Sequence, residues 1–164
     1  MRPSLDAYMM LLAYVAASRT TCVRRGVGCV LADSRGRILA VGYNGVASGL
    51  PHCNEGHFCS GHDLPPGRDC CEAVHAEQNA LLQCTRPDDI AAAYVTLSPC
   101  LACTKLLANT GCLRVVYLEE HSVSAAAKEL WLKSRPGRSW ELLDEDPRNT
   151  GWADETATKT QEAT

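Results

Sequence analysis

The chain has 164 residues, of which 46% are hydrophobic and 21% are charged, and its formal net charge is −3. A chain of this length can bury one hydrophobic core and is short for two, so we expect a single domain. A protein that grips a long nucleic-acid backbone normally has a basic surface, which this composition does not supply. A small anionic substrate in a local basic pocket fits the charge better than a nucleic-acid polymer.

The first nineteen residues include an apolar stretch of about a dozen residues that Asp6 and Tyr8 interrupt. This pattern favours an amphipathic helix over a signal peptide or a membrane span. The chain contains ten cysteines. With no export signal, cysteines in a reducing compartment bind metal or pack as small hydrophobic residues. We therefore expect a cytoplasmic metal protein with no membrane partner.

The first half of the chain predicts a helix followed by a hairpin. Ser4 is a suitable cap for a helix over residues 5–18. Residues 27–32 and 38–41 have the character of strands and are joined by a turn over 33–37. Residues 44–71 are rich in Gly, Pro, Cys and His, and they form a loop too long for an ordinary connection. Some additional interaction must hold that loop in place.

The second half alternates helices and strands. We expect helices over 72–83, 100–110 and 125–133, and strands over 92–97, 113–118 and 139–143. This alternation predicts an α/β sheet with parallel pairing in its second half. Residues 144–164 are acidic, rich in Thr and nearly without aliphatic residues, which predicts a flexible C-terminal tail. The folded domain is therefore expected over residues 1–143.

The clearest chemical signal is His75-Ala76-Glu77 followed by Pro99-Cys100 and then Cys103. One imidazole and two thiolates are three good zinc ligands, and the fourth tetrahedral position stays open for water. Cys100 and Cys103 lie one helical turn apart, so their sulfurs point the same way, and a helix N-terminus favours the thiolate form. An open position predicts a catalytic zinc site.

Glu77 lies next to the predicted metal but is not needed as a ligand. Zinc lowers the pKa of its bound water, and a neighbouring carboxylate can move protons between that water, the ring nitrogen and the leaving amine. This HxE and PCxxC pattern is a signature of zinc deaminases. The alternatives are a closed structural zinc site, which gives no reason for Glu77, and a redox CxxC pair, which gives no reason for His75.

The motifs around this centre resemble those of the dCMP deaminase family within the cytidine deaminase superfamily, over about residues 5–120. They are TCVR from Thr21, VG from Val27, GYNG from Gly42, HAEQNAL from His75 and YVTLSPC from Tyr94. The resemblance implies a three-layer α/β/α fold with a central mixed five-stranded sheet. It also implies hydrolysis of dCMP to dUMP and ammonia, which supplies pyrimidine deoxynucleotides.

Residue by residue, the resemblance implies that His75, Cys100 and Cys103 bind the catalytic Zn²⁺ and that Glu77 shuttles protons. It further implies that Asn44 contacts the sugar and that main-chain groups near Ala76 and Ser98 hold the edge of the cytosine. The roles of Glu77, Asn44, Ala76 and Ser98 are expectations of the family pattern. Asn44 also belongs to an Asn-Gly pair, which on its own is ordinary turn chemistry.

Arg24 is our candidate for the 5′-phosphate, because a planar guanidinium binds phosphate oxygens in bidentate fashion. The adjacent Arg25 could take this role instead, or Arg24 could be an ordinary surface arginine. Tyr117 is either a residue that stacks near the base or a core tyrosine, and the second interpretation is favoured.

The long loop resembles phage and bacterial relatives in which cysteines bind a second, structural Zn²⁺. The relatives have cysteines at the positions of Cys22, Cys53 and Cys70. The candidate ligands here are Cys22, Cys53, Cys59 and Cys70, with His52, His57 and His62 as competing ligands. Four protein ligands would close that site and tie down the loop. The alternative is a set of buried thiols. The chain departs from many relatives at Asp69 and Glu72, where they have a histidine and an arginine.

Other properties follow from the resemblance alone. It implies homo-oligomers, commonly hexamers, with activation by dCTP and inhibition by dTTP, and with Mg²⁺ on the triphosphate. Deamination of dCTP, CMP or a modified dCMP stays open as an alternative. A tRNA adenosine deaminase shares the zinc motif but should be basic. An inactive zinc scaffold or effector-binding subunit is the non-enzymatic alternative, and it gives no reason to retain Glu77.

Overall fold

The computed structural model describes residues 2–59, 61, 63, 71–144, 146 and 147. Its α-helices are α1 (Leu5–Ala17), α2 (Ala76–Gln83), α3 (Leu101–Ala108) and α4 (Ala125–Ser134), and its short 3₁₀ helices are η1 (Cys53–Glu55) and η2 (Pro87–Asp89). Its strands are β1 (Gly28–Ala32), β2 (Ile38–Tyr43), β3 (Gly45–Val46), β4 (Ala73–Val74), β5 (Ala92–Leu97), β6 (Arg114–Glu119) and β7 (Ser139–Leu142). The predicted elements are present, with boundary shifts of at most four residues.

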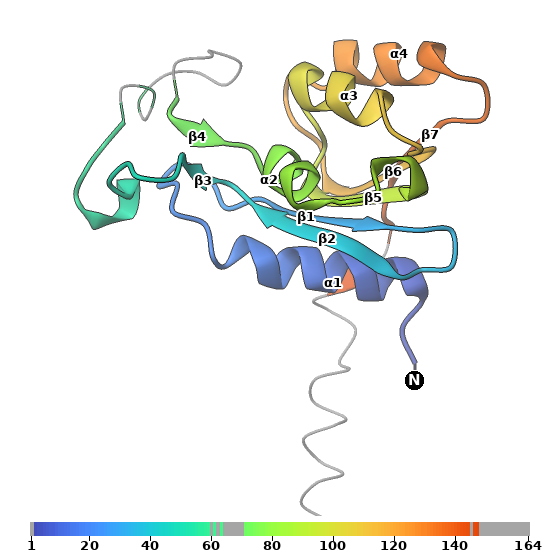
Figure 1. Ribbon diagram of the computed structural model, residues 1–164, viewed down its shortest axis with the longest axis horizontal. Helices are drawn as coiled ribbons and strands as arrows, with labels where there is room; N and C mark the ends of the chain where they lie inside the picture. Colours follow the sequence, from blue (N-terminus) through green and yellow to red (C-terminus); the bar gives the residue numbers. More distant parts are fainter. Residues whose placement is uncertain (1, 60, 62, 64–70, 145, 148–164) are drawn as a thin grey trace, which may run out of the picture.

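Five strands form the central sheet in the order β2-β1-β5-β6-β7. β1 pairs antiparallel with β2 and with β5, whereas β5–β6 and β6–β7 are parallel. The predicted mixed five-stranded sheet, with parallel pairing in its second half, is confirmed. Helix α1 covers one face, and α2, α3 and α4 lie on the other, which makes three layers (Figure 1).

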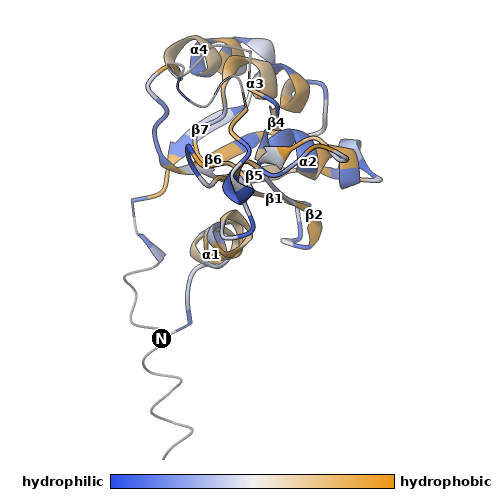
Figure 2. Ribbon diagram, turned by 90° about the vertical axis from the view of Figure 1, so that its left-hand side faces the viewer, coloured by the Kyte–Doolittle hydropathy of each residue, from blue (hydrophilic) through white to orange (hydrophobic). Residues whose placement is uncertain are grey.

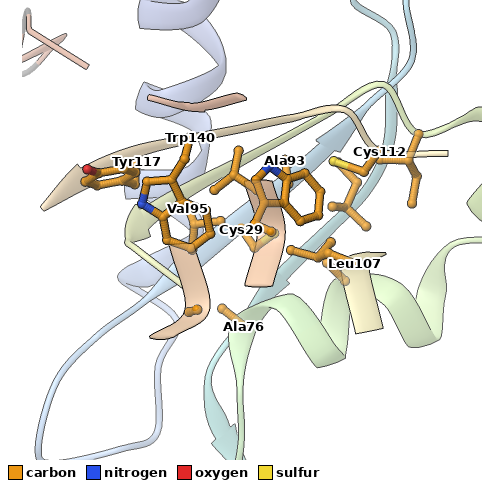
Figure 3. Close-up of a cluster of buried hydrophobic side chains, with 14 of the residues drawn as sticks. Cys29, Ala76, Ala93, Val95, Leu107, Cys112, Tyr117 and Trp140 are labelled. Atoms are coloured by element: carbon orange, nitrogen blue, oxygen red, sulfur yellow. The ribbon is translucent and has the colours of Figure 1, made fainter. Parts of the chain in front are cut away.

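Side chains alternate between the two faces of the sheet, as a strand period of two requires. Val30, Tyr94 and Val116 face α1, where they pack with Met9, Met10 and Ala13. Their strand neighbours face the other helices and form the larger core cluster, which includes Cys29, Val95, Val115, Leu107 and Trp131. Figure 3 shows part of this cluster, and Figure 2 shows hydrophobic residues on the elements that meet between the layers.

Two glycines let helices approach the sheet from opposite sides. A Cβ at Gly28 would lie 1.8 Å from the carbonyl oxygen of Ala13 on α1, and one at Gly42 would lie 2.3 Å from that of Ala76 on α2. No side chain fits between backbones this close. α1 therefore packs directly against β1 on one face of the sheet, and α2 packs directly against β2 on the other.

The long segment after β2 differs from the expected loop. β3 and β4 form a small antiparallel ribbon in which Gly45 pairs with Val74 and Val46 with Ala73. This pairing corrects the predicted start of α2: residues 73 and 74 are a strand, and the helix begins at Ala76 instead of Glu72. Long-range pairing outweighs local helix propensity here.

The predicted tail falls mostly on residues outside the described part of the chain, so its flexibility stays a prediction. In the residues that the structure does describe, no helix is both long enough and apolar enough to cross a membrane.

Arg114 joins α1 to the sheet through two carboxylates. Its guanidinium donates to Asp6 at 3.0 Å and to Glu141 at 2.6 Å, and Tyr94 also donates to Asp6 at 2.6 Å. Burial raises the pKa of Asp6, but the hydrogen bonds from Arg114 and Tyr94 outweigh it and bring the pKa below 3.8. The hydrogen bond from Arg114 likewise lowers the pKa of Glu141.

We predict that Arg114→Met lowers the free energy of unfolding by about 1–2 kcal/mol at neutral pH. Because both carboxyl pKa values are lowered by folding, their contribution is present above their unfolded values and is lost as the pH falls through the folded ones. The difference between Arg114→Met and wild type should therefore shrink at about pH 3. Urea unfolding at both pH values measures this.

The control is Lys133→Met, which removes an exposed ion pair with Glu129 on α4. That variant should stay within about 0.5 kcal/mol of wild type. Equal effects of the two substitutions would contradict the prediction.

Candidate metal centre and active site

The functional residues meet at one edge of the sheet because of how the strands run. β5 and β6 both end there, with Leu97 paired to Glu119, and the antiparallel β1 begins there, with Gly28 paired to Tyr43 at the end of β2. The carboxyl ends of parallel strands are where open α/β sheets place their sites. The segments that carry the predicted residues all begin or end at this edge.

His75, Cys100 and Cys103 come together as predicted. His75 precedes the first residue of α2, and Cys100 precedes that of α3. The Nδ1 atom of His75 lies 3.5 Å from the Sγ of Cys100 and 3.4 Å from the Sγ of Cys103. Their ligand atoms all lie within 4.8 Å of one another, and no other group of three or more candidate ligands meets this limit among the described residues.

These distances fit a tetrahedral zinc site. Zinc bonds of about 2.3 Å to sulfur and about 2.0–2.1 Å to nitrogen place neighbouring S and N ligands about 3.6 Å apart at the tetrahedral angle. The observed separations of 3.4 and 3.5 Å are close to that ideal distance. Three protein ligands leave one position of the tetrahedron for water or substrate, as in catalytic sites.

The pKa values of Cys100 and Cys103 depend on each other. A hydrogen bond from Cys103 lowers the pKa of Cys100 to about 3, and the interaction with Cys100 together with burial raises the pKa of Cys103. Cys103 is completely buried on the first turn of α3. A cation bound by both sulfurs would replace the proton of Cys103, which is the usual way in which metal binding is linked to pH.

Glu77 is buried beside the triad. Its side chain is 3% exposed and lies within hydrogen-bonding reach of Cys103. Burial raises the pKa of Glu77 to about 7, opposed by its own backbone N–H and by His75. A carboxyl group with a pKa near neutrality can both accept and donate a proton, which a shuttle requires. The local helix geometry explains its position, because Glu77 is in the first turn of the helix that His75 caps.

Asn44 is buried and is bonded to the protein on several sides. Its Oδ1 accepts from Thr20 Oγ1 at 2.8 Å and from the Val27 N–H at 2.7 Å, and its Nδ2 donates to the carbonyl oxygen of Arg25 at 2.8 Å. The residue therefore braces the segment that carries both arginines. Its expected contact with the sugar stays a prediction.

Ser98 and Ala76 are buried at the functional edge of the sheet. Ser98 lies two residues before Cys100, and Ala76 directly follows His75. The N–H of Ser98 donates to the carbonyl oxygen of Glu119, and its hydroxyl accepts from the N–H of His121. Their predicted contacts with the base are consistent with this placement and are not otherwise tested. Tyr117 is a core residue, 4% exposed and packed against Trp140, as favoured from the sequence.

Arg24 and Arg25 flank the site but have different partners. Arg24 donates to the carbonyl oxygen of Gly61 at 3.2 Å, whereas Arg25 forms an ion pair with Glu119 at the end of β6. Sequence reasoning did not find Glu119 or His121. The only available signal was their position directly after a strand that ends at the functional edge.

The cysteines of the long loop converge in part. The Sγ atoms of Cys59 and Cys71 lie 3.6 Å apart, Cys53 is hydrogen-bonded to Cys59, and Cys22 lies close enough to interact electrostatically with Cys53 and Cys71. Cys70 and His62 lie outside the described residues, and His52 and His57 are exposed. Cys71, to which no role was assigned from the sequence, is part of this group.

Comparison with known proteins agrees with the geometry. The fold and the three-ligand centre are those of zinc-dependent deaminases. Residues 3–119 match the family model described as the cytidine and deoxycytidylate deaminase zinc-binding region. The chain belongs to this family.

Two similar proteins are deoxycytidylate deaminases. The deoxycytidylate deaminase of Mycobacterium phage D29 is 43% identical over 126 residues, which cover 73% of this chain and 98% of that enzyme. The deoxycytidylate deaminase of Schizosaccharomyces pombe is 37% identical over 134 residues, which cover 79% of this chain but 41% of that enzyme. The chain thus spans nearly all of the phage enzyme and about two fifths of the yeast one.

A solved structure is also similar. The dCMP deaminase of cyanophage S-TIM5, in complex with dCMP and dUMP, has a TM-score of 0.69 and 26% sequence identity. The similarity covers 87% of this chain and 99% of that one. The shared three-layer fold therefore extends well beyond the zinc motif.

We predict that Gly42→Ala weakens zinc binding and lowers activity at least about tenfold, because its Cβ must push α2, with His75 and Glu77, away from the sheet. Zinc content after dialysis against a weak chelator and the deamination rate measure this. Val41→Ala, at the neighbouring position on the opposite face of β2, is the control and should keep its zinc. Wild-type zinc affinity in Gly42→Ala would show that this close approach does not position the ligands.

Proposed function

We propose that this chain hydrolyses dCMP to dUMP and ammonia. The observation that carries the proposal is the His75–Cys100–Cys103 triad with Glu77 buried beside it, in a chain 43% identical to a phage deoxycytidylate deaminase. A similar structure holds dCMP and dUMP. Zn²⁺ bound at the triad would supply the Lewis acid that makes water nucleophilic near neutral pH.

The chain's own residues supply positioning and proton transfer. Glu77 takes the proton from the attacking water, gives it to the ring N3, and later carries a proton to the departing amine, so that the amine leaves as ammonia. In this arrangement, main-chain groups near Ala76 and Ser98 bind the edge of the cytosine ring. Glu77 and Cys103 are buried, so the interactions that they make are less screened by water than those of an exposed pair.

The 5′-phosphate is assigned to Arg24. Arg24 lies on the segment between α1 and β1 that Asn44 braces, at the same edge as the triad. Arg25 is ion-paired with Glu119, so Arg24, whose observed partner is a neutral carbonyl, has more cationic charge to offer an anion. The sugar would then lie between the triad and this segment, near Asn44.

We predict that Glu77→Gln lowers the rate of dCMP deamination by about 10²–10⁴-fold, because the amide cannot accept or donate the required proton. The zinc content should stay unchanged. Chromatography of reactions with dCMP, dCTP, CMP, deoxycytidine and a tRNA anticodon stem-loop identifies the substrate. Glu129→Gln, an exposed position on α4, is the matched control.

Two outcomes would count against the proposed function. Wild-type protein that holds zinc but deaminates another substrate in preference to dCMP would preserve the zinc mechanism and refute the phosphate assignment. An active Glu77→Gln variant would refute the proton shuttle.

A second, structural Zn²⁺ is proposed at the cysteines of the long loop. Ideal tetrahedral Zn–S bonds of about 2.3 Å place sulfurs about 3.8 Å apart, and the Sγ atoms of Cys59 and Cys71 are 3.6 Å apart. Cys22 and Cys53 would supply the other two thiols, and a bound metal would have to draw them in, because the described cysteines do not all lie within 4.8 Å of one another. Cys71 is therefore a candidate ligand beside Cys70, which the family pattern matches and which lies outside the described residues.

This site has a mechanical link to the proposed phosphate residue. A Cβ on Gly61 would lie 2.6 Å from the Cα of Cys71, so the two backbones are in close contact. The carbonyl oxygen of the same Gly61 accepts the hydrogen bond of Arg24. A metal that fixes Cys71 therefore also helps to fix Arg24.

We predict that Cys71→Ser removes the second zinc and raises the KM for dCMP at least about threefold, with a smaller change in kcat, because Arg24 loses its support. Cys70→Ser and Cys84→Ser should keep two zinc ions per chain, measured by elemental analysis. Loss of zinc in Cys70→Ser but not in Cys71→Ser would assign the ligand to Cys70 instead.

Oligomers, with the hexamer favoured, control by dCTP and dTTP with Mg²⁺, and a cytoplasmic location stay predictions of the family resemblance. Sedimentation of the purified chain, with and without dCTP and Mg²⁺, would test the first two.

A further inference from the structure

His121 is held firmly at the functional edge, directly after β6. Its N–H donates to the hydroxyl of Ser98 at 2.8 Å, and its carbonyl oxygen accepts from the N–H of Ser124 at 3.0 Å. The imidazole Nδ1 lies 3.2 Å from the N–H of Val123 and accepts from it. Backbone and ring are therefore both fixed before any substrate arrives.

The ring contact also decides which nitrogen can donate. A nitrogen that accepts a hydrogen bond from an N–H has no proton of its own, so the neutral ring carries its proton on Nε2. Burial lowers the pKa of His121, Arg25 and Arg24 lower it further, and Cys100 opposes them. The neutral ring with an Nε2–H donor is thus the state near neutral pH.

The ring lies near both the metal ligands and the two arginines. Cys100 and His75 of the triad interact with it electrostatically, and so do Arg24 and Arg25. The strand pairing gives the same placement independently, since β6 ends beside β5 at the edge where β1 begins. Arg25 also forms its ion pair with Glu119, two residues before His121.

We propose that the Nε2–H of His121 donates a hydrogen bond to the 5′-phosphate of the nucleotide and thereby favours a nucleotide over a nucleoside. This inference depends on the proposed function. Both neighbouring arginines already have protein partners, Gly61 for Arg24 and Glu119 for Arg25. A phosphate has more acceptor sites than two partly engaged guanidinium groups satisfy.

A neutral donor suits this position physically. A third cation beside Arg24 and Arg25 would repel both when no substrate is bound, and its burial would cost free energy. A neutral N–H avoids both costs and can still donate a hydrogen bond to a phosphate oxygen. Glu119 and Glu120 lie on the same segment, with Glu119 bound to Arg25 and Glu120 accepting from the hydroxyl of Ser124.

The test compares nucleotide with nucleoside in His121→Ala, His121→Gln and Ser122→Ala. Ser122 is an exposed neighbour in the same turn and serves as the control. We expect His121→Ala to raise the KM for dCMP and the Kd for dUMP by about tenfold or more, with kcat at saturation and zinc content changed little. Deoxyuridine should bind the variant and the wild type equally in calorimetry.

His121→Gln should recover part of the lost dUMP affinity, because its amide also offers an N–H donor, whereas a merely structural role would not discriminate between nucleotide and nucleoside. Equal weakening of dUMP and deoxyuridine, or a fall in kcat with KM unchanged, would overturn the inference. If wild type binds dUMP but does not deaminate dCMP, the proposed function fails while the binding comparison still decides the role of His121.

Discussion

The active site depends on how closely α2 packs against β2. At Gly42 the helix backbone lies where a Cβ would otherwise be, and the first turn of α2 therefore sits directly over the sheet. That turn begins with His75 and contains Glu77. The ligand and the proton shuttle consequently have fixed positions relative to Ser98 and Cys100, which leave the sheet two strands away. On the opposite face, α1 makes the same kind of contact at Gly28, so the sheet cannot yield to relieve a clash.

A second constraint is the concentration of acidic groups in a buried space. Glu77 and Cys103 are buried, and hydrogen bonds from Cys103 and His75 lower the pKa of Cys100. The first-turn N–H groups of α2 and α3 stabilise part of this negative charge, since those of Glu77 and Cys103 lower the pKa of Glu77 and Cys100. Three ionised groups together would still be unfavourable in so little water. A divalent cation at the triad removes the conflict, and this explains why the same fold binds the metal and keeps a carboxylate beside it.

The sequence predicted the catalytic centre well because its information is local. The spacing of His75 and Glu77 and that of Cys100 and Cys103 each lie within one helical turn, and the flanking strands have strong patterns. The start of α2 could not be predicted in this way, since Ala73 and Val74 pair with a strand almost thirty residues away. The part that Cys71 plays in the cysteine group was equally out of reach, because its contact with Cys59 joins two segments of the long loop. Asn44 shows a third limit: its turn signal was visible, but its bonds to Thr20, Val27 and Arg25 depend on how two distant segments meet.

The molecule separates its chemistry from its selectivity. The triad and Glu77 stand on helices and strands whose positions are fixed by the core, which suits groups that must be placed to within a fraction of an ångström. The groups assigned to the phosphate, Arg24 and His121, stand on connecting segments that hydrogen bonds, and not core packing, hold at the edge of the sheet. Loops of this kind can change in sequence without disturbing the core. The same zinc centre can therefore serve different nucleotides in different relatives, with selectivity set by the loops at the edge of the sheet and the reaction set by the layers beneath them.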